Sequence, residues 1–140
     1  MIHRILFYML AGTLLFYACQ GKGKRITREE ALREANLTRV ELEEKVFDLG
    51  DIRPGEVAGH TFRVKNTGEK DLFLLDIETS CGCTTTSYTR GPIKPGKQGT
   101  VEVKFDSSGR FGKQYKVVQV FVNTREKIFE LTIKANIINP

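Results

Sequence analysis

Two cysteines separated by one glycine have the clearest capacity for chemistry in this chain. They stand in the string Ser80-Cys81-Gly82-Cys83-Thr84. Residues i and i+2 of an extended strand lie about 6.6 to 7 Å apart at Cα, which is the edge of what a disulfide tolerates, and a turn at Gly82 would shorten that distance. A bridge there would be strained, and strain raises the reduction potential. An oxidised pair would therefore exchange readily with other thiols.

Two other interpretations of the pair stay open. Both thiols can remain reduced and pack as small, half-buried hydrophobic groups, with Gly82 needed for the backbone shape, and this is the role we expect. The pair also supplies two of the four ligands of a metal site. His60 and an acidic residue such as Asp76 or Glu78 would have to complete that site, and nothing in their spacing selects them. A lone histidine at the start of a strand is more often a rim residue than a ligand, so we expect no metal or other cofactor.

The remaining patterns do not assemble an enzyme. The chain has no Gly-x-Ser-x-Gly nucleophile elbow, and its scattered serines and aspartates form no ordered triad with a histidine. The segment PGKQGT (residues 95–100) lacks the spacing of a phosphate-binding loop. Phe111 and Tyr115 lie beside cations, as in interaction hot spots, but we expect them to cap the core. The sequence thus predicts a non-catalytic protein.

The N-terminus predicts export. Residues 1–4 carry one positive charge, and residues 5–18 are uncharged and mostly apolar, which is the length of a secretory signal and too short for a membrane span. The stretch ends in LFYAC (residues 15–19), which resembles the lipobox of bacterial lipoproteins, with bulkier residues than usual before Ala18. An ordinary signal peptide with a chance cysteine is the alternative. We expect cleavage before Cys19 and lipidation of that cysteine.

The segment behind Cys19 predicts a tether to a membrane. Residues 21–25 (GKGKR) combine flexible glycines with three cations that can touch anionic headgroups. Gln20 and the lack of an acidic run resemble the sorting signals of lipoproteins that face the periplasm from the outer membrane. The capping-box pattern TREE (residues 27–30) predicts a short amphipathic helix near residues 28–36.

Turn signals at close intervals predict a β domain further along. The segments IRPGE (residues 52–56) and IKPGK (residues 93–97) place Pro before Gly, as type II turns require, and each should introduce a strand. The strings at residues 66–68 and 123–125 should close strands. Five segments between these signals alternate in polarity, as half-buried strands do. Their inward residues would be Phe62 and Val64; Phe73, Leu75 and Ile77; Val101, Val103 and Phe105; Val118, Val120 and Val122; Phe129, Leu131, Ile133 and Ala135.

The number and length of the strands predict an immunoglobulin-like β-sandwich. Residues 46–47 and 84–88 bring the total to about seven strands in about 100 residues. A small β-barrel is the main alternative. The predicted organisation is a lipoprotein signal peptide over residues 1–18, an anchor, basic tether and short helix over residues 19–40, and the all-β sandwich over residues 41–140.

The net charge of +5 does not predict a nucleic-acid partner. No basic cluster is interleaved with aromatic residues for stacking on bases. Several lysines instead fall on the polar phases or at the ends of the predicted strands, where they would form a solvated face that discourages edge pairing. These are Lys65, Lys104, Lys116 and Lys134.

Four short strings together resemble a bacterial family. They are FDLG (residues 47–50), NTG (66–68), SCGCT (80–84) and PG (95–96). Their order and spacing over roughly residues 43–138 resemble domain-of-unknown-function family 1573, which is related to the Hydin-like immunoglobulin domains of ciliary and centrosomal proteins. The resemblance implies an exported, often lipid-anchored, seven-stranded sandwich, and it implies no activity.

The functional prediction is a non-catalytic binding or scaffolding module. It would hang from the outer membrane into the periplasm through lipidated Cys19, and its partner would be a protein or a glycan. Thiol-disulfide exchange at Cys81 and Cys83 is the enzymatic alternative, and metal handling at the same two residues is a third possibility.

Overall fold

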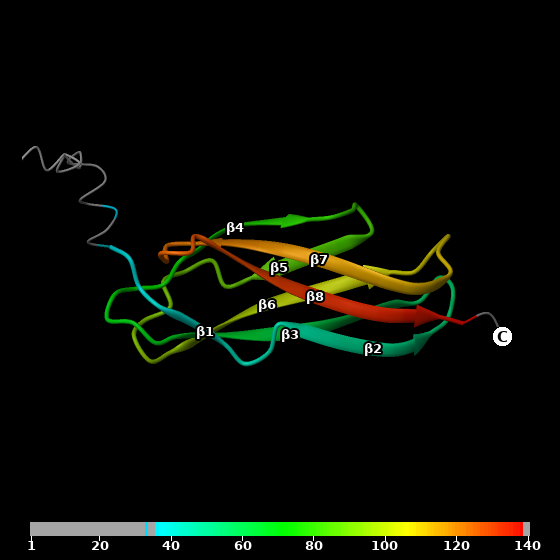
Figure 1. Ribbon diagram of the computed structural model, residues 1–140, viewed down its shortest axis with the longest axis horizontal. Coiled ribbons are helices and arrows are strands. Elements are labelled where there is room, and N and C mark those ends of the chain that lie inside the picture. The colour runs from blue at the N-terminus through cyan, green and yellow to red at the C-terminus, as the bar shows by residue number, and fades with distance from the viewer. Residues whose placement is uncertain (1–32, 34–35, 139–140) are drawn as a thin grey trace, which may run out of the picture.

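Two four-stranded sheets pack face to face in the part of the chain that the structure describes (Figure 1). The computed structural model describes Arg33 and residues 36–138. One sheet has the order β1-β3-β6-β5 and consists of β1 (Val40–Leu42), β3 (Val57–Asn66), β6 (Gln98–Asp106) and β5 (Thr84–Tyr88). The other has the order β2-β8-β7-β4 and consists of β2 (Val46–Ile52), β8 (Ile128–Ile137), β7 (Gly112–Val122) and β4 (Leu74–Thr79). Neighbouring strands are antiparallel except β2 and β8, which run parallel.

The predicted immunoglobulin-like sandwich is confirmed. The barrel alternative is wrong, because the eight strands of the described residues form two separate sheets, with no ladder between a strand of one and a strand of the other. The predicted alternation is also correct in β3, β6, β7 and β8, whose inward side chains meet between the sheets. Those that are fully or almost fully buried are Phe62, Val64, Val101, Val103, Phe105, Val118, Val120, Val122, Leu131, Ile133 and Ala135.

The inward face of β4 is shifted by one residue from the prediction at Phe73 and Leu75, whereas Ile77 packs against the core as predicted. Leu72 and Leu74 are buried, whereas Phe73 and Leu75 are 39% and 61% exposed. Leu72 is drawn into the core by two backbone hydrogen bonds of 2.9 Å to Ile93. The pairing of β4 with β7 then changes register after Leu74, as at a β-bulge. This irregularity broke the period-two pattern on which the prediction depended.

The two Pro-Gly turns lie where the sequence predicts them. Gly55 and Gly96 have φ angles of +80° and +74°, which residues other than glycine rarely adopt. A backbone hydrogen bond closes each turn, from Glu56 to Arg53 at 3.1 Å and from Lys97 to Lys94 at 2.9 Å. The first turn leads into β3 and the second into β6.

A buried asparagine closes one end of the sandwich. The Asn66 side-chain oxygen accepts hydrogen bonds from the Thr38 hydroxyl at 2.9 Å and from the Gly68 N–H at 3.0 Å. Its amide nitrogen donates to the carbonyls of Lys70 at 2.7 Å and Ile93 at 2.8 Å. The side chain therefore uses all of its hydrogen-bonding capacity. The Asn66 side chain thus connects the segment before β1, the end of β3 and the segment before β6.

The N-terminal predictions lie almost entirely outside the described residues. These are the signal peptide, Cys19, the basic tether and the helix near residues 28–36, of which only Arg33 and Asn36 are described. Among the residues that can be described, no helix is long and apolar enough to cross a membrane.

Replacing Asn66 should destabilise the fold strongly. In Asn66→Ala, the Gly68 N–H loses its acceptor, and the carbonyls of Lys70 and Ile93 each lose one of their two donors. We therefore expect the free energy of unfolding to fall by about 3 kcal/mol or more. Urea unfolding measures this change. Asn136→Ala is the matched control, because the Asn136 amide bonds the Asp51 carboxylate at the surface and should matter by less than about 1 kcal/mol. Equal losses in the two variants would contradict the role given to Asn66.

Candidate functional site

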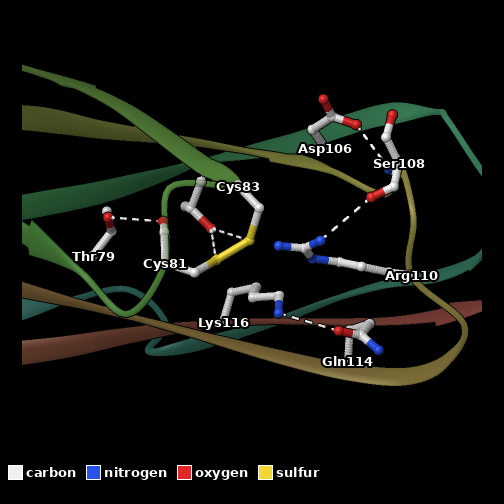
Figure 2. Close-up of a disulfide and its surroundings, with 9 residues drawn as sticks. Thr79, Cys81, Cys83, Asp106, Ser108, Arg110, Gln114 and Lys116 are labelled. Carbon is white, nitrogen blue, oxygen red and sulfur yellow. Dashed lines mark hydrogen bonds between the residues drawn. A yellow bond between two sulfur atoms is a disulfide. The ribbon is translucent and has the colours of Figure 1, made fainter.

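Cys81 and Cys83 form a disulfide in the turn between β4 and β5 (Figure 2). Their Cα atoms are 5.3 Å apart, within the ordinary range for a disulfide. The turn at Gly82 thus brings the two residues closer than an extended strand would. The expectation that both thiols remain reduced and act only as packing groups is therefore wrong.

The backbone around the disulfide is held by hydrogen bonds from three elements. The Cys81 carbonyl accepts from the Thr84 N–H at 3.3 Å and from the Thr79 hydroxyl at 3.2 Å. The Cys83 carbonyl accepts from the N–H of Asp106, at the end of β6, at 2.9 Å. Both cysteines are half-buried. The site is a fixed corner of the sandwich that remains accessible to solvent.

The disulfide adds little to the stability of the fold. In the chain-entropy model, closing a loop of three residues stabilises a protein by about 1.6 kcal/mol, compared with about 3 kcal/mol for a loop of fifteen. The apolar core supplies far more, because each fully buried aliphatic or aromatic side chain contributes roughly 1.5 to 3 kcal/mol. Cys83 packs only at the margin of a small cluster at this end of the core. Stabilisation of the fold is therefore a poor explanation for the presence of this disulfide.

Two cationic side chains lie beside the disulfide. Figure 2 shows the guanidinium of Arg110 pointing toward the sulfur atoms and the side chain of Lys116 on the same side of the site. Lys116 and Cys83 both contact the Phe105 cluster, and the Lys116 ammonium is 5.2 Å from the centre of the Phe105 ring. Burial lowers the pKa of Lys116, and the charge of Arg110 lowers it further. Neither cation makes an ion pair with any described residue.

The loop between β6 and β7 fixes the position of Arg110. The buried Ser107 hydroxyl donates to the Arg53 carbonyl at 2.7 Å, which ties this loop to the turn before β3. The Arg110 N–H donates to the Ser107 carbonyl at 3.1 Å, and the Arg110 guanidinium to the Ser108 carbonyl at 3.3 Å. The nearby Asp106 carboxylate accepts the Ser108 N–H at 2.9 Å, and hydrogen bonds from Ser108 lower its pKa. Ser108 is thus the main partner of this carboxylate, and the charge of Arg110 lowers its pKa by a smaller amount.

Lys116 does not belong to a solvated face, contrary to the prediction. It is half-buried and has the same phase as the inward residues Val118 and Val120. Its neighbour Tyr115 points to the other face of the sheet. Its spacing of two and four residues from Val118 and Val120 was the sequence signal that could have placed Lys116 on the inward face of β7. Arg110 lies in a loop, and its sequence carries no comparable signal.

Phe111 and Tyr115 do not cap the core, which corrects a second prediction. Their side chains are 72% and 59% exposed. The Lys134 ammonium lies 5.8 Å from the centre of the Tyr115 ring. The side chain that lies over Phe105 of the core is that of Lys116. Exposed aromatic residues therefore lie at the end of the sandwich that carries the disulfide.

His60 is held in an aromatic and acidic environment of its own. Its ring stacks on Phe47 with 3.6 Å between centroids, meets Phe62 edge-on at 4.8 Å, and hydrogen-bonds the Glu44 carboxylate at 2.5 Å. The structure brings neither Asp76 nor Glu78 to it. Among described residues, no three His, Cys, Asp or Glu side chains are grouped as metal ligands. Because Cys81 and Cys83 are bonded to each other, they do not form a metal site with His60 in this structure.

A groove lies where the first strand changes sheets. Thr38 forms a parallel bridge with Thr124 of the second sheet, and the chain then enters β1, which pairs with β3 of the first sheet. It returns to the second sheet in β2, whose pairing with β8 begins at Val46 and Thr132. The groove between these elements has a volume of about 980 Å³. Its apolar lining residues are Val40, Leu42, Val46, Ile128 and Phe129.

One buried polar group in this groove lacks a partner. Thr124 is 1% exposed and lines the groove, and its hydroxyl makes no hydrogen bond within the described part of the protein. Buried hydroxyls are nearly always hydrogen-bonded, because leaving one unpaired costs about 1 to 3 kcal/mol. The sequence did not predict this groove, which depends on the change of sheet by β1.

Solved structures of similar fold have varied functions. A protein of unknown function from Porphyromonas gingivalis W83 matches with a TM-score of 0.64 and 21% identity, over 74% of this chain and 48% of that chain. The PapD-like domain 7 of human CEP192 matches with a TM-score of 0.59 and 13% identity, over 75% of this chain and 89% of that one. The VesB protease of Vibrio cholerae matches with a TM-score of 0.54 and 17% identity, over 80% of this chain and 35% of that chain. At these identities the likeness concerns the fold.

The chain spans about half of the Porphyromonas gingivalis protein and about a third of VesB. A comparison with curated proteins found no match. A family model described as a protein of unknown function, DUF1573, matches residues 40–137, which include all eight strands. The match confirms the resemblance drawn from the short sequence strings. The chain therefore belongs to the DUF1573 family.

Proposed function

We propose that this protein is an exported, lipid-anchored binding module that holds an extended segment of a partner protein in the groove between β1, β2 and β8. One observation carries the proposal: β8 lacks a strand neighbour over Ile128–Leu131, on the side facing the groove, among the described residues. An unpaired strand edge is a ready template for an added strand.

The direction of the free peptide groups follows from the pairing with β2. The Thr132 N–H donates to the Lys45 carbonyl at 2.8 Å, so the peptide groups of Thr132 face the β2 side. Residues two apart in a strand share this direction. The N–H and C=O groups of Ile128 and Glu130 therefore face the groove, where an extended segment can hydrogen-bond them.

The groove also specifies the chemistry of the added segment. Val40, Leu42 and Phe129 are half-buried against the core and form an apolar floor. Val46 and Ile128 at its margin are 47% and 39% exposed and would gain burial. A segment with apolar side chains at alternate positions satisfies both the floor and the strand edge. Main-chain amides and aliphatic side chains favour such a peptide over a glycan.

The proposed cellular location rests on the N-terminal signal and on the disulfide. The signal resembles that of a lipoprotein, and disulfides persist mainly in oxidising compartments outside the cytoplasm. We place the protein at the outer membrane, facing the periplasm, with lipid on Cys19. The described chain begins beside the Thr38–Thr124 bridge, so the groove lies at the end of the sandwich where the described chain begins.

Lipidation should depend on Cys19 alone. Cells grown with labelled palmitate should incorporate the label into the full chain, and Cys19→Ser should abolish labelling and release the protein from the membrane fraction. Two or more acyl chains are needed for stable anchoring, so the loss should be nearly complete. Cys81→Ser is the control and should keep the label. A Cys19→Ser protein that is still labelled would contradict the anchor.

Removing one N–H from the β8 edge should weaken partner binding. Glu130→Pro deletes a donor that faces the groove and leaves the ladder with β7 intact, since that ladder uses the alternate residues. In-cell photo-crosslinking from position 128 should capture a partner, and Glu130→Pro should reduce capture roughly fivefold, the effect of one hydrogen bond of about 1 kcal/mol.

Two controls complete this experiment. Glu130→Ala keeps the N–H and should retain capture. A crosslinker at Val57, which is 61% exposed on β3, should not give the same product. The proposal fails if Glu130→Ala and Glu130→Pro behave alike, or if both crosslinker positions capture the same protein.

A further inference from the structure

We infer that the Cys81–Cys83 disulfide is redox-active and oxidises pairs of thiols in other proteins, with Arg110 and Lys116 as positioning residues that stabilise its reduced form. This inference goes beyond partner binding in the groove and does not depend on it. The disulfide lies in the β4–β5 turn, at the end of the sandwich opposite the Thr38–Thr124 bridge (Figure 1).

The electrostatics of the site favour the reduced pair. The oxidised pair is neutral, and neither of the two cations beside it makes an ion pair with a described residue, although the charge of Arg110 also acts on the Asp106 carboxylate. Reduction creates thiolate charge at the place toward which Arg110 points and beside which Lys116 lies (Figure 2). Opposite charges at close range favour the ionised form of a thiol. A disulfide whose reduced form is stabilised in this way is a stronger oxidant.

Polar groups around the sulfurs add to this stabilisation. The Thr84 hydroxyl lies 3.7 Å from the Cys81 sulfur and 3.8 Å from the Cys83 sulfur, so it can donate to either one. Asp106 is the acidic residue next to the site, and its carboxylate is bonded by Ser108. The charged groups that surround the pair are therefore Arg110, Lys116 and this occupied carboxylate.

The exchange proceeds in two balanced steps. A thiolate of the partner protein attacks one sulfur of the pair, the Cys81–Cys83 bond breaks, and the electron pair leaves on the other sulfur as a thiolate beside the cations. The second partner thiol loses its proton and attacks the resulting mixed disulfide. Two electrons and two protons have then passed from the partner to the cysteines, and the partner carries a new disulfide. A small-molecule disulfide such as oxidised glutathione reoxidises the pair.

Exposed aromatic residues provide a place for such a partner to contact this end. Phe111 follows Arg110 directly in the chain, and its side chain is 72% exposed. Tyr115 precedes Lys116 and is 59% exposed. Chains that still need disulfides are incompletely folded and expose apolar side chains, which pack readily on aromatic surfaces.

Redox titration tests the role of the cations. The full chain with Cys19→Ser, which leaves the pair as its sole thiols, is equilibrated in glutathione redox buffers, trapped with an alkylating reagent and weighed intact. Arg110→Gln combined with Lys116→Gln should shift the equilibrium toward the disulfide by roughly tenfold, since each pKa unit of lost thiolate stabilisation is worth a factor of ten. Alkylation of the reduced pair at neutral pH should slow in parallel.

A matched control separates this effect from a general change of charge. Lys113 is exposed on the opposite face of β7, so Lys113→Gln should leave the equilibrium unchanged. An equilibrium that is the same in the double variant and the parent protein overturns the role of the two cations. An equal shift of the equilibrium in Lys113→Gln would also overturn the role of the two cations.

Activity on a thiol substrate tests the exchange itself. Reduced, unfolded ribonuclease in glutathione buffer serves as the probe, and the protein should accelerate its recovery of disulfides and activity. The variant with Cys81→Ser and Cys83→Ser should lose this acceleration while keeping its circular dichroism spectrum and its crosslink from position 128. Equal acceleration by the parent and the double serine variant, or none by either, would overturn the inference and leave the groove proposal standing.

Discussion

The hydrogen bonds of the buried Asn66 amide are the interactions on which the rest of this structure depends. They hold Thr38 against the end of β3, and Thr38 in turn forms the bridge to Thr124. The chain that leaves this bridge must continue into the first sheet as β1 and can return to the second only at β2. The open edge of β8 and the groove beside it are consequences of this crossing.

The two ends of the sandwich are closed by different means. At one end, buried amide and hydroxyl groups bind main-chain groups of several loops. At the other, Ser107 ties the β6–β7 loop to the turn before β3, and the side chain of Lys116 lies over Phe105. A lysine used as a core cover keeps its ammonium at the margin, where its charge has few neighbours to offset it. The second end is therefore structurally fixed, and its two cations make no ion pair among the described residues.

Local chemistry explains which parts of the fold could be predicted from sequence. The Pro-Gly turns require a particular backbone, and the β6, β7 and β8 segments alternate without interruption, so their roles can be assigned from short windows. The face of β4 could not be assigned, because it depends on the pairing of Leu72 with Ile93, twenty-one residues away along the chain. The register change after Leu74 then returns Ile77 to the predicted inward face.

The candidate sites were harder to predict than the fold, because they also depend on contacts between residues that are distant in the sequence. The cysteine pair was visible as a motif, but the sequence left open whether it would be bonded. The approach of Arg110 and Lys116 to that pair is a property of loop packing and has no short-range pattern. The groove requires knowledge of which sheet β1 joins, and three residues of strand carry too little periodicity to decide it.

The parallel pairing of β2 with β8 affects how the domain bears mechanical load. The described chain begins at one end of the sandwich, and β8 ends at the other, roughly 33 Å away for a ten-residue strand (Figure 1). A pull between the start of the described chain and the end of β8 would slide β2 along β8, so the hydrogen bonds between them would be stretched together rather than broken one after another. A domain joined in this way resists extension along its length.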